Sequence, residues 1–199
     1  MYKRELHNFF LQSVILLCLA ICANGQKRAP INLKAFSLKS IEGENVYFQF
    51  SKVLPTVIIF LSPECPLCQK YSLVLNKLHT TFNGKTDIVG IFTGNGYSNS
   101  QYEQFKTKYR ISFKLFVDKK SRLAGMLHAS ITPEAFFLNS EGLVLYQGAI
   151  DDWYVSLGKN KPKPSQNYLE GALVHYFNKQ PISPVKTNPI GCLINFELR

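Results

Sequence analysis

The chain has 199 residues, of which 46% are hydrophobic, and its formal net charge is +10. This length predicts one domain with appendages, and the hydrophobic share is ample for a globular core. The sequence contains no nucleic-acid-binding motif, so we expect no nucleic acid partner. The basic excess indicates acidic partners or an anionic membrane surface at most.

Residues 1–25 have the features of a secretory signal peptide. Lys3 and Arg4 give a positive start, residues 9–22 are mostly apolar, and residues 23–25 offer a cleavage site. The apolar run is short for a membrane span, which needs about 20 residues. We therefore expect an exported protein, periplasmic or secreted, with a lipid anchor at Cys22 or an uncleaved anchor as alternatives.

The mature chain is then expected to hold a domain over residues 26–180 and an extended tail over 181–199. The sequence has five cysteines, and cleavage after Gly25 leaves Cys65, Cys68 and Cys192. Export implies an oxidising compartment, where a pair of thiols stays reduced only if a reductant is supplied.

Two short strands are expected first, at residues 34–38 and 46–50. Residues 57–61 then form a β-branched and aromatic run without polar alternation, which predicts a strand covered on both faces. A helix is expected to begin at the cysteines, because Pro66 suits the first helical turn. Apolar side chains then recur at helical spacing, at Tyr71, Val74, Leu75, Leu78 and Phe82.

The Cys-x-x-Cys pair at this helix start carries the predicted chemistry. The helix N-terminus stabilises a thiolate, so Cys65 is expected to be the attacking and more exposed sulfur. Cys68, three residues later, is placed to resolve a mixed disulfide. A carboxylate at Glu64 disfavours the thiolate, so we expect a less acidic Cys65 than a helix end alone would give.

Other interpretations of the pair are a structural disulfide and half of a metal site. Zinc needs about four ligands, and the sequence has no second Cys-x-x-Cys and no His-x-x-x-His. Attachment of c-type haem needs a histidine where this chain has Gln69. We expect no metal and no cofactor.

The remaining elements alternate between strands and helices. Thr132-Pro133 precedes a strand, and residues 151–166 form a polar excursion. Strands are expected at 87–93, 113–117, 133–138 and 143–147, and helices at 98–109, 121–129 and 167–178. This order predicts an α/β fold, with a mixed central sheet and helices on both faces.

The chain has a strand, a Cys-x-x-Cys pair and a helix in succession, and later a Thr-Pro pair before another strand. In this order it resembles the thioredoxin-like superfamily. The closer match is its AhpC/TSA-related redoxin branch of exported reductases and peroxiredoxin relatives. The resemblance implies a thioredoxin-like fold and thiol-disulfide oxidoreductase activity on protein thiols or disulfides, with an unidentified redox partner. It implies a cis Pro133, and it implies that the backbone of Thr132 faces the cysteines and pairs with a substrate segment.

The sequence departs from this family in one respect. Thioredoxin-type sites often carry a buried acid on the central strand, whereas residues 57–61 contain no ionisable group. Proton transfer from Cys68 would then need Glu64, water or a remote group.

Two rival functions stay open at this stage. Peroxiredoxin-like peroxidases use Pro-x-x-x-Thr/Ser-x-x-Cys; Ser62 matches this pattern, but Ile58 stands where proline is needed. A copper metallochaperone would use the two thiolates and a distant histidine, for which His128 is the candidate. Cys192 is left over once Cys65 and Cys68 are paired. It is either a buried packing residue or a third thiol near Cys65.

Overall fold

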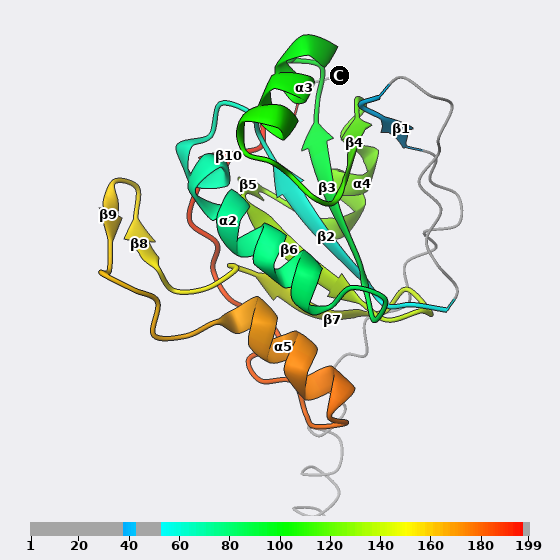
Figure 1. Ribbon diagram of the computed structural model, residues 1–199, viewed down its shortest axis with the longest axis vertical. Coiled ribbons are helices and arrows are strands. Elements are labelled where there is room, and N and C mark those ends of the chain that lie inside the picture. Colours follow the sequence, from blue (N-terminus) through cyan, green and yellow to red (C-terminus); the bar gives the residue numbers. More distant parts are fainter. Residues whose placement is uncertain (1–37, 43–52, 197–199) are drawn as a thin grey trace, which may run out of the picture.

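The computed structural model describes residues 38–42 and 53–196 (Figure 1). The expected signal segment 1–25 and strand 46–50 lie outside the described residues, as does nearly all of the expected strand 34–38. No helix within the described ranges is long and apolar enough to cross a membrane. The elements are β1 (Lys39–Ser40), β2 (Thr56–Leu61), α2 (Pro66–Thr81), β3 (Asp87–Thr93), α3 (Asn99–Lys108), β4 (Lys114–Asp118), α4 (Arg122–Leu127), β5 (Ile131–Thr132), β6 (Glu134–Leu138), β7 (Val144–Gly148), β8 (Tyr154–Ser156), β9 (Lys159–Asn160), α5 (Tyr168–Phe177) and β10 (Cys192–Leu193).

Strand β2 lies at the centre of a six-stranded sheet with the order β1-β4-β3-β2-β6-β7. It pairs in parallel with β3 and antiparallel with β6, and all six of its residues are buried. The parallel pairs β2–β3 and β3–β4 come from the two helical crossovers, whereas β6 and β7 form an antiparallel hairpin. The mixed sheet expected from the sequence is confirmed.

Helices cover both faces of this sheet (Figure 1). One apolar cluster joins β2 residues Val57, Ile59 and Leu61 to side chains from α2, α3 and α5. A second cluster joins Ile58 and Phe60 of the same strand to side chains from α4. Because successive residues of a strand point to opposite faces, the unbroken apolar run of β2 supplies both clusters. The sheet therefore holds the end of β2, and with it the cysteine turn, rigidly.

The described elements agree with the predicted ones to within a few residues, with two exceptions. The polar excursion over residues 151–166 contains a small hairpin, β8–β9. The second exception is that the expected extended tail contains a short strand, β10, which pairs with another unpredicted short strand, β5, directly before Pro133. After α5 the chain turns back, and this C-terminal segment, red in Figure 1, runs along the molecule toward the start of α2.

This C-terminal segment is anchored at two places. Beside β7, the Gln147 amide donates to the Val185 carbonyl over 3.0 Å, and the Thr187 amide donates to the Gln147 carbonyl over 2.9 Å. Further on, β10 pairs antiparallel with β5, which lies directly before Pro133. The segment thus brings Cys192 back to the cysteine turn.

Candidate active site

The turn between β2 and α2 carries the two neighbouring cysteines. Cys65 is the N-cap residue of α2, Pro66 occupies its first turn, and Cys68 lies one turn into the helix. The Cys65 amide donates to the Ser62 carbonyl over 3.2 Å, which closes the turn. Proline suits this position because an amide there would lack a helical acceptor. The predicted placement of the pair at a helix start is confirmed.

Cys192 of β10 lies against the first of these cysteines. Its Sγ is 2.7 Å from the Cys65 Sγ, and all three thiols are free. Cys65 is only 2% exposed and Cys68 is fully buried. Cys65 is thus the more exposed thiol of the pair, as expected, but only slightly, because it lies against the neighbouring strand β10, whose Cys192 remains partly exposed.

Thr132, which precedes Pro133, also lies next to Cys65. The Thr132–Pro133 peptide bond is cis, as the family resemblance implies. When protonated, the Cys65 thiol donates to the Thr132 carbonyl over 3.2 Å. When ionised, Cys65 instead accepts from Cys192. The Thr132 backbone thus faces Cys65, while its strand pairs with Cys192 of the same chain.

Cys65 is an acidic thiol in this setting. A hydrogen bond from the Cys68 thiol is the largest cause and, with a smaller contribution from the Cys192 thiol, outweighs burial and lowers the pKa of Cys65 to about 5. Glu64 is exposed, and its carboxylate accepts a long hydrogen bond from Gln101 at 3.5 Å. The expectation that Glu64 makes Cys65 less acidic is wrong, because the neighbouring thiols dominate.

Cys68 has the opposite character. Burial raises the pKa of the Cys68 thiol well above its usual value, and the hydrogen bond to Cys65 and the charge of Cys65 raise it further. The Ser62 amide donates to the Cys68 Sγ over 3.4 Å, which works weakly in the other direction. The pair is therefore divided into an ionised first thiol and a protonated second thiol.

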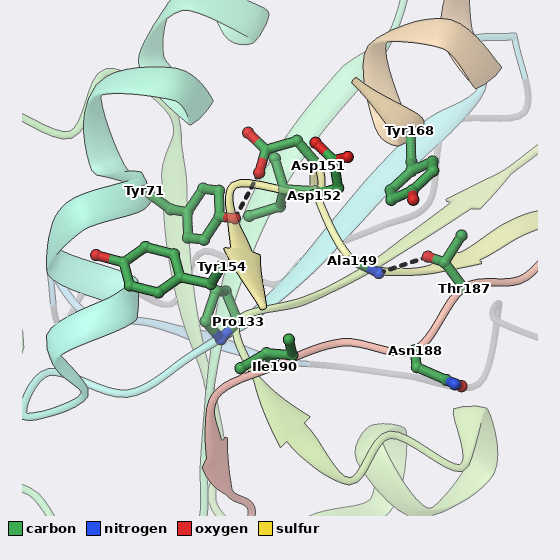
Figure 2. A pocket seen from close by; sticks show the side chains of 11 residues that line it. Tyr71, Pro133, Ala149, Asp151, Asp152, Tyr154, Tyr168, Thr187, Asn188 and Ile190 are labelled. Carbon is green, nitrogen blue, oxygen red and sulfur yellow. Dashed lines mark hydrogen bonds between the residues drawn. The ribbon is translucent and has the colours of Figure 1, made fainter. Parts of the chain in front are cut away.

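A cavity of about 390 Å³ lies next to Pro133 (Figure 2). Its wall includes Tyr71 of α2 and Asp151, which follows β7, and the Tyr71 hydroxyl donates to the Asp151 carboxylate over 2.5 Å. Burial raises the pKa of Asp151. The C-terminal segment completes the wall with Thr187, Asn188 and Ile190. Sequence reasoning missed these roles, because residues 80 positions apart in the chain meet here.

A second buried acid, Glu134, follows the cis-proline. Its carboxylate accepts from the amides of Ser130 and Ile131, at 3.0 and 3.4 Å, and from the Gln147 side chain. These bonds fix the loop that leads into β5. Strand β2 itself carries no acid, in agreement with the sequence.

The residues that a peroxidase or a copper metallochaperone would use are Ser62 and His128. The Ser62 hydroxyl shares a hydrogen bond with the Tyr97 hydroxyl at 3.0 Å. His128 is the exposed C-cap of α4. Among the residues that the structure describes, no group of three or more histidine, cysteine or acidic side chains is arranged to hold a metal ion.

Comparison with known families agrees with this arrangement. The family model described as AhpC/TSA matches residues 29–147, which is more than half of the chain. The chain belongs to the AhpC/TSA family. The matched residues of this AhpC/TSA protein run through the cysteine turn, Thr132 and Pro133, and they end within β7. Cys192 and the C-terminal segment lie beyond the match.

Two proteins of Bacillus subtilis strain 168 are similar to this AhpC/TSA chain. Thioredoxin-like protein YneN is 27% identical over 110 residues, which cover 55% of this chain and 64% of YneN. Sporulation thiol-disulfide oxidoreductase A is 26% identical over 125 residues, which cover 60% of this chain and 73% of that protein. The chain thus spans roughly two thirds of the length of these relatives, and slightly less of YneN.

Solved structures share the fold at lower identity. An uncharacterised conserved protein from Geobacillus kaustophilus has a TM-score of 0.75 and 20% identity, covering 88% of this chain and 95% of its own. A secreted Mycobacterium tuberculosis disulfide oxidoreductase has a TM-score of 0.54 and 21% identity, covering 71% and 96%. The fold of this AhpC/TSA protein is thioredoxin-like.

Proposed function

We propose that this protein is an exported thiol-disulfide oxidoreductase whose redox centre is the Cys65–Cys68 pair. Protein thiols or disulfides are its substrates, and Thr132 and Pro133 position the substrate strand. The name of the B. subtilis relative Sporulation thiol-disulfide oxidoreductase A supports the reaction class. The observation that carries the proposal is the division of the pair into an acidic Cys65 at the helix N-cap and a buried, protonated Cys68.

In the first step the Cys65 thiolate attacks one sulfur of a substrate disulfide. The substrate S–S bond breaks, a mixed disulfide with Cys65 forms, and the second substrate sulfur leaves as a thiolate that takes up a proton. The lowered pKa of Cys65 keeps this nucleophile ionised at neutral pH.

In the second step Cys68 attacks the Cys65 sulfur. Once Cys65 is part of a mixed disulfide it carries no charge, so two causes of the raised Cys68 pKa are removed and this thiol loses its proton more readily. The substrate leaves as a second thiol, and the Cys65–Cys68 disulfide remains. The substrate has gained two electrons, and the protein dithiol has lost two.

The test is a redox titration of the purified full-length chain in a series of thiol/disulfide buffers. Free thiols are alkylated, and the bound alkyl groups are counted by mass. In a Cys192→Ser background, which leaves only the Cys65–Cys68 pair among the described cysteines, we expect a reversible two-electron couple that is lost when Cys65 or Cys68 is also replaced by serine. Reduction of a disulfide-containing protein is measured beside it, because a couple without such activity would contradict the proposed function.

Peroxidase activity is the competing outcome of the same experiment. A peroxidase would consume hydrogen peroxide with rapid oxidation of Cys65, and it would act only slowly on protein disulfides. The incomplete peroxidatic motif argues for the opposite order, in which disulfide exchange is faster than peroxide consumption.

Export is part of the proposal and rests on residues 1–25 alone. Its measurement is the mass of the protein recovered from the producing cells and from the surrounding fraction. A chain that begins after Gly25 and is found outside the cytoplasm supports export by a cleaved signal. A chain of full mass in the cytoplasm contradicts it.

A further inference from the structure

Strand β10 occupies the edge of β5, directly before the cis-proline. Cys192 lies opposite Thr132, and Leu193 lies opposite Ile131, in an antiparallel pair. Under the proposed function, on which this inference rests, Thr132 is where a substrate strand would pair. The chain therefore places its own cysteine-bearing strand at that edge, with the Cys192 Sγ 2.7 Å from the Cys65 Sγ.

Several contacts hold this strand in register. The Ile194 amide donates to the Ser130 carbonyl over 2.8 Å, and the Thr132 hydroxyl donates to the Cys192 carbonyl over 3.4 Å. Gly191 lies so close to β5 that an added Cβ would collide with the Thr132 carbonyl. A glycine is needed wherever two backbones approach this closely. Gly191 therefore allows β10 to pair with β5.

The same segment is fixed further upstream by its threonine. The Thr187 hydroxyl accepts from the Ala149 amide over 2.9 Å and shares a second hydrogen bond with the Tyr146 hydroxyl at 2.6 Å. The first of these bonds is drawn in Figure 2. A segment tied at both ends delivers Cys192 to Cys65 at a high effective concentration.

We propose that Cys192 is a third redox-active thiol, and that β10 is a built-in substrate strand which exchanges disulfides with the Cys65–Cys68 pair. The reaction starts from the oxidised pair. Cys192 loses its proton and attacks the Cys65 sulfur; the Cys65–Cys68 bond breaks, a Cys65–Cys192 bond forms, and Cys68 leaves as a thiolate that takes up the proton. No electrons are gained or lost, so no external oxidant is needed.

The charges at the site are compatible with this exchange. Burial, and then the hydrogen bond and charge of Cys65, raise the pKa of Cys192 to about 12 while Cys65 is a thiolate. In the oxidised pair Cys65 is neutral, so the contributions of its charge and hydrogen bond are lost and Cys192 ionises more easily. Cys192 is therefore more readily ionised in the oxidised pair, which is the state that holds the disulfide bond that it attacks.

Trypsin separates the possible disulfides cleanly. Cleavage after Lys52 and Lys70 leaves Cys65 and Cys68 in one peptide, whereas cleavage after Lys186 places Cys192 in the peptide 187–199. The full-length chain is oxidised by one equivalent of a two-electron oxidant and quenched with an alkylating reagent, then digested without reduction. We expect a cross-linked pair of peptides 53–70 and 187–199 beside the internally bridged peptide 53–70.

Single substitutions assign the sulfurs. Cys68→Ser should trap the Cys65–Cys192 disulfide almost completely, and Cys65→Ser should abolish the cross-link. A cross-link that persists in Cys65→Ser, and so joins Cys68 to Cys192, would overturn the proposal. So would the absence of any cross-link in Cys68→Ser.

The role of strand pairing is tested without changing a thiol. Gly191→Ala should lower the cross-linked fraction by at least about tenfold, because the misfit removes the advantage of intramolecular placement. Leu193→Ala is the matched control, since Leu193 is 81% exposed in the same strand, and it should leave the fraction unchanged. Equal fractions in the two variants would show that β10 does not position Cys192.

The outcome is separable from that of the proposed function. A reversible Cys65–Cys68 couple with protein disulfide reduction, but without the cross-link, would overturn only the role of Cys192. Loss of both the couple and the activity, with the cross-link still formed in Cys68→Ser, would overturn the proposed function and leave Cys192 as the partner of Cys65.

Discussion

The hydroxyl of Tyr71 donates a 2.5 Å hydrogen bond to the carboxylate of Asp151, which joins helix α2 to the loop after β7. The same carboxylate oxygen accepts from the Trp153 amide over 2.8 Å. The Trp153 and Tyr154 rings contact the Tyr71 ring at centroid distances of 5.8 and 5.9 Å. The helix that carries the cysteines is thus tied to the segment that lines the cavity beside Pro133.

Removal of the hydroxyl in Tyr71→Phe should destabilise the protein by about 1–3 kcal/mol, because a buried carboxylate loses one of its donors. The free energy of unfolding in denaturant measures this change. A double-mutant cycle with Asp151→Ala, which removes the acceptor, isolates the pair. Additive effects of the two substitutions would contradict the assigned hydrogen bond.

The acidity of Cys65 should depend more on Cys68 than on Cys192. The Cys68 thiol is the largest cause of the lowered pKa of about 5, and the Cys192 thiol is a smaller one. Cys68→Ala should therefore raise the pKa of Cys65 more than Cys192→Ala does. The ultraviolet absorbance of the thiolate, titrated in the reduced protein, measures both, and the reverse order would refute this assignment.

The stability of the reduced protein should rise with pH between about 5 and about 8.5. The folded pKa of Cys65 is lowered to about 5, whereas an unfolded cysteine titrates near 8.5. Between these values the unfolded state binds more protons, so the contribution of this thiolate is complete above about 8.5 and is lost as the pH falls through 5. The slope is up to about 1.4 kcal/mol per pH unit, and the difference between wild type and Cys65→Ser across the pH series isolates it.

Gly90 in β3 should tolerate no side chain. An added Cβ would lie 2.5 Å from the Leu115 Cδ2 and 2.8 Å from the Leu61 Cδ1, both in the core. Overpacking of this kind costs about 1–3 kcal/mol, so we expect Gly90→Ala to lower the melting temperature. In Gly125→Ala, within α4, the added Cβ meets no atom within 4 Å; this control should be neutral or stabilising, because alanine has the better helix propensity.

Asp118 should be essential for the start of α4. Its buried carboxylate accepts from the amides of Arg122, Leu123 and Ala124 at 3.0, 2.8 and 3.1 Å. The N-cap residue Ser121 provides no side-chain cap. Asp118→Ala should cost about 1–3 kcal/mol, and Asp118→Asn, which keeps one acceptor oxygen, should cost less. Equal losses of stability in the two variants would argue against the capping role.

The elements around the cysteines could be predicted because their signals are local. The apolar run that became β2 and the helical spacing that followed it were each contained within about 20 residues. Pro66 marked the helix start for a reason that does not depend on the rest of the fold. The placement of Thr132 and Pro133 beside Cys65 came instead from the family resemblance, since nothing local connects positions 65 and 132.

The remainder of the site depends on contacts that are distant in sequence. Burial of Cys65 results from Cys192, which is 127 residues away. The lowered pKa of Cys65 results first from the Cys68 thiol and then from the Cys192 thiol, and reasoning from Glu64 included neither, so it reached the wrong sign. The Tyr71–Asp151 pair likewise joins positions that are distant in sequence. One signal was available: a glycine directly before the odd cysteine is typical of a close approach by another backbone.

The hydrogen bond from the Ile194 amide to the Ser130 carbonyl has a consequence for measurement. That amide becomes available to solvent only when β10 separates from the loop before β5. Its deuterium exchange rate, compared with that of a core amide in β2, therefore reports how often the cysteine turn is uncovered without any chemical modification. The ratio of its exchange rate to the intrinsic rate of the same unprotected amide converts into the free energy of local opening, which an incoming protein must overcome to reach Cys65.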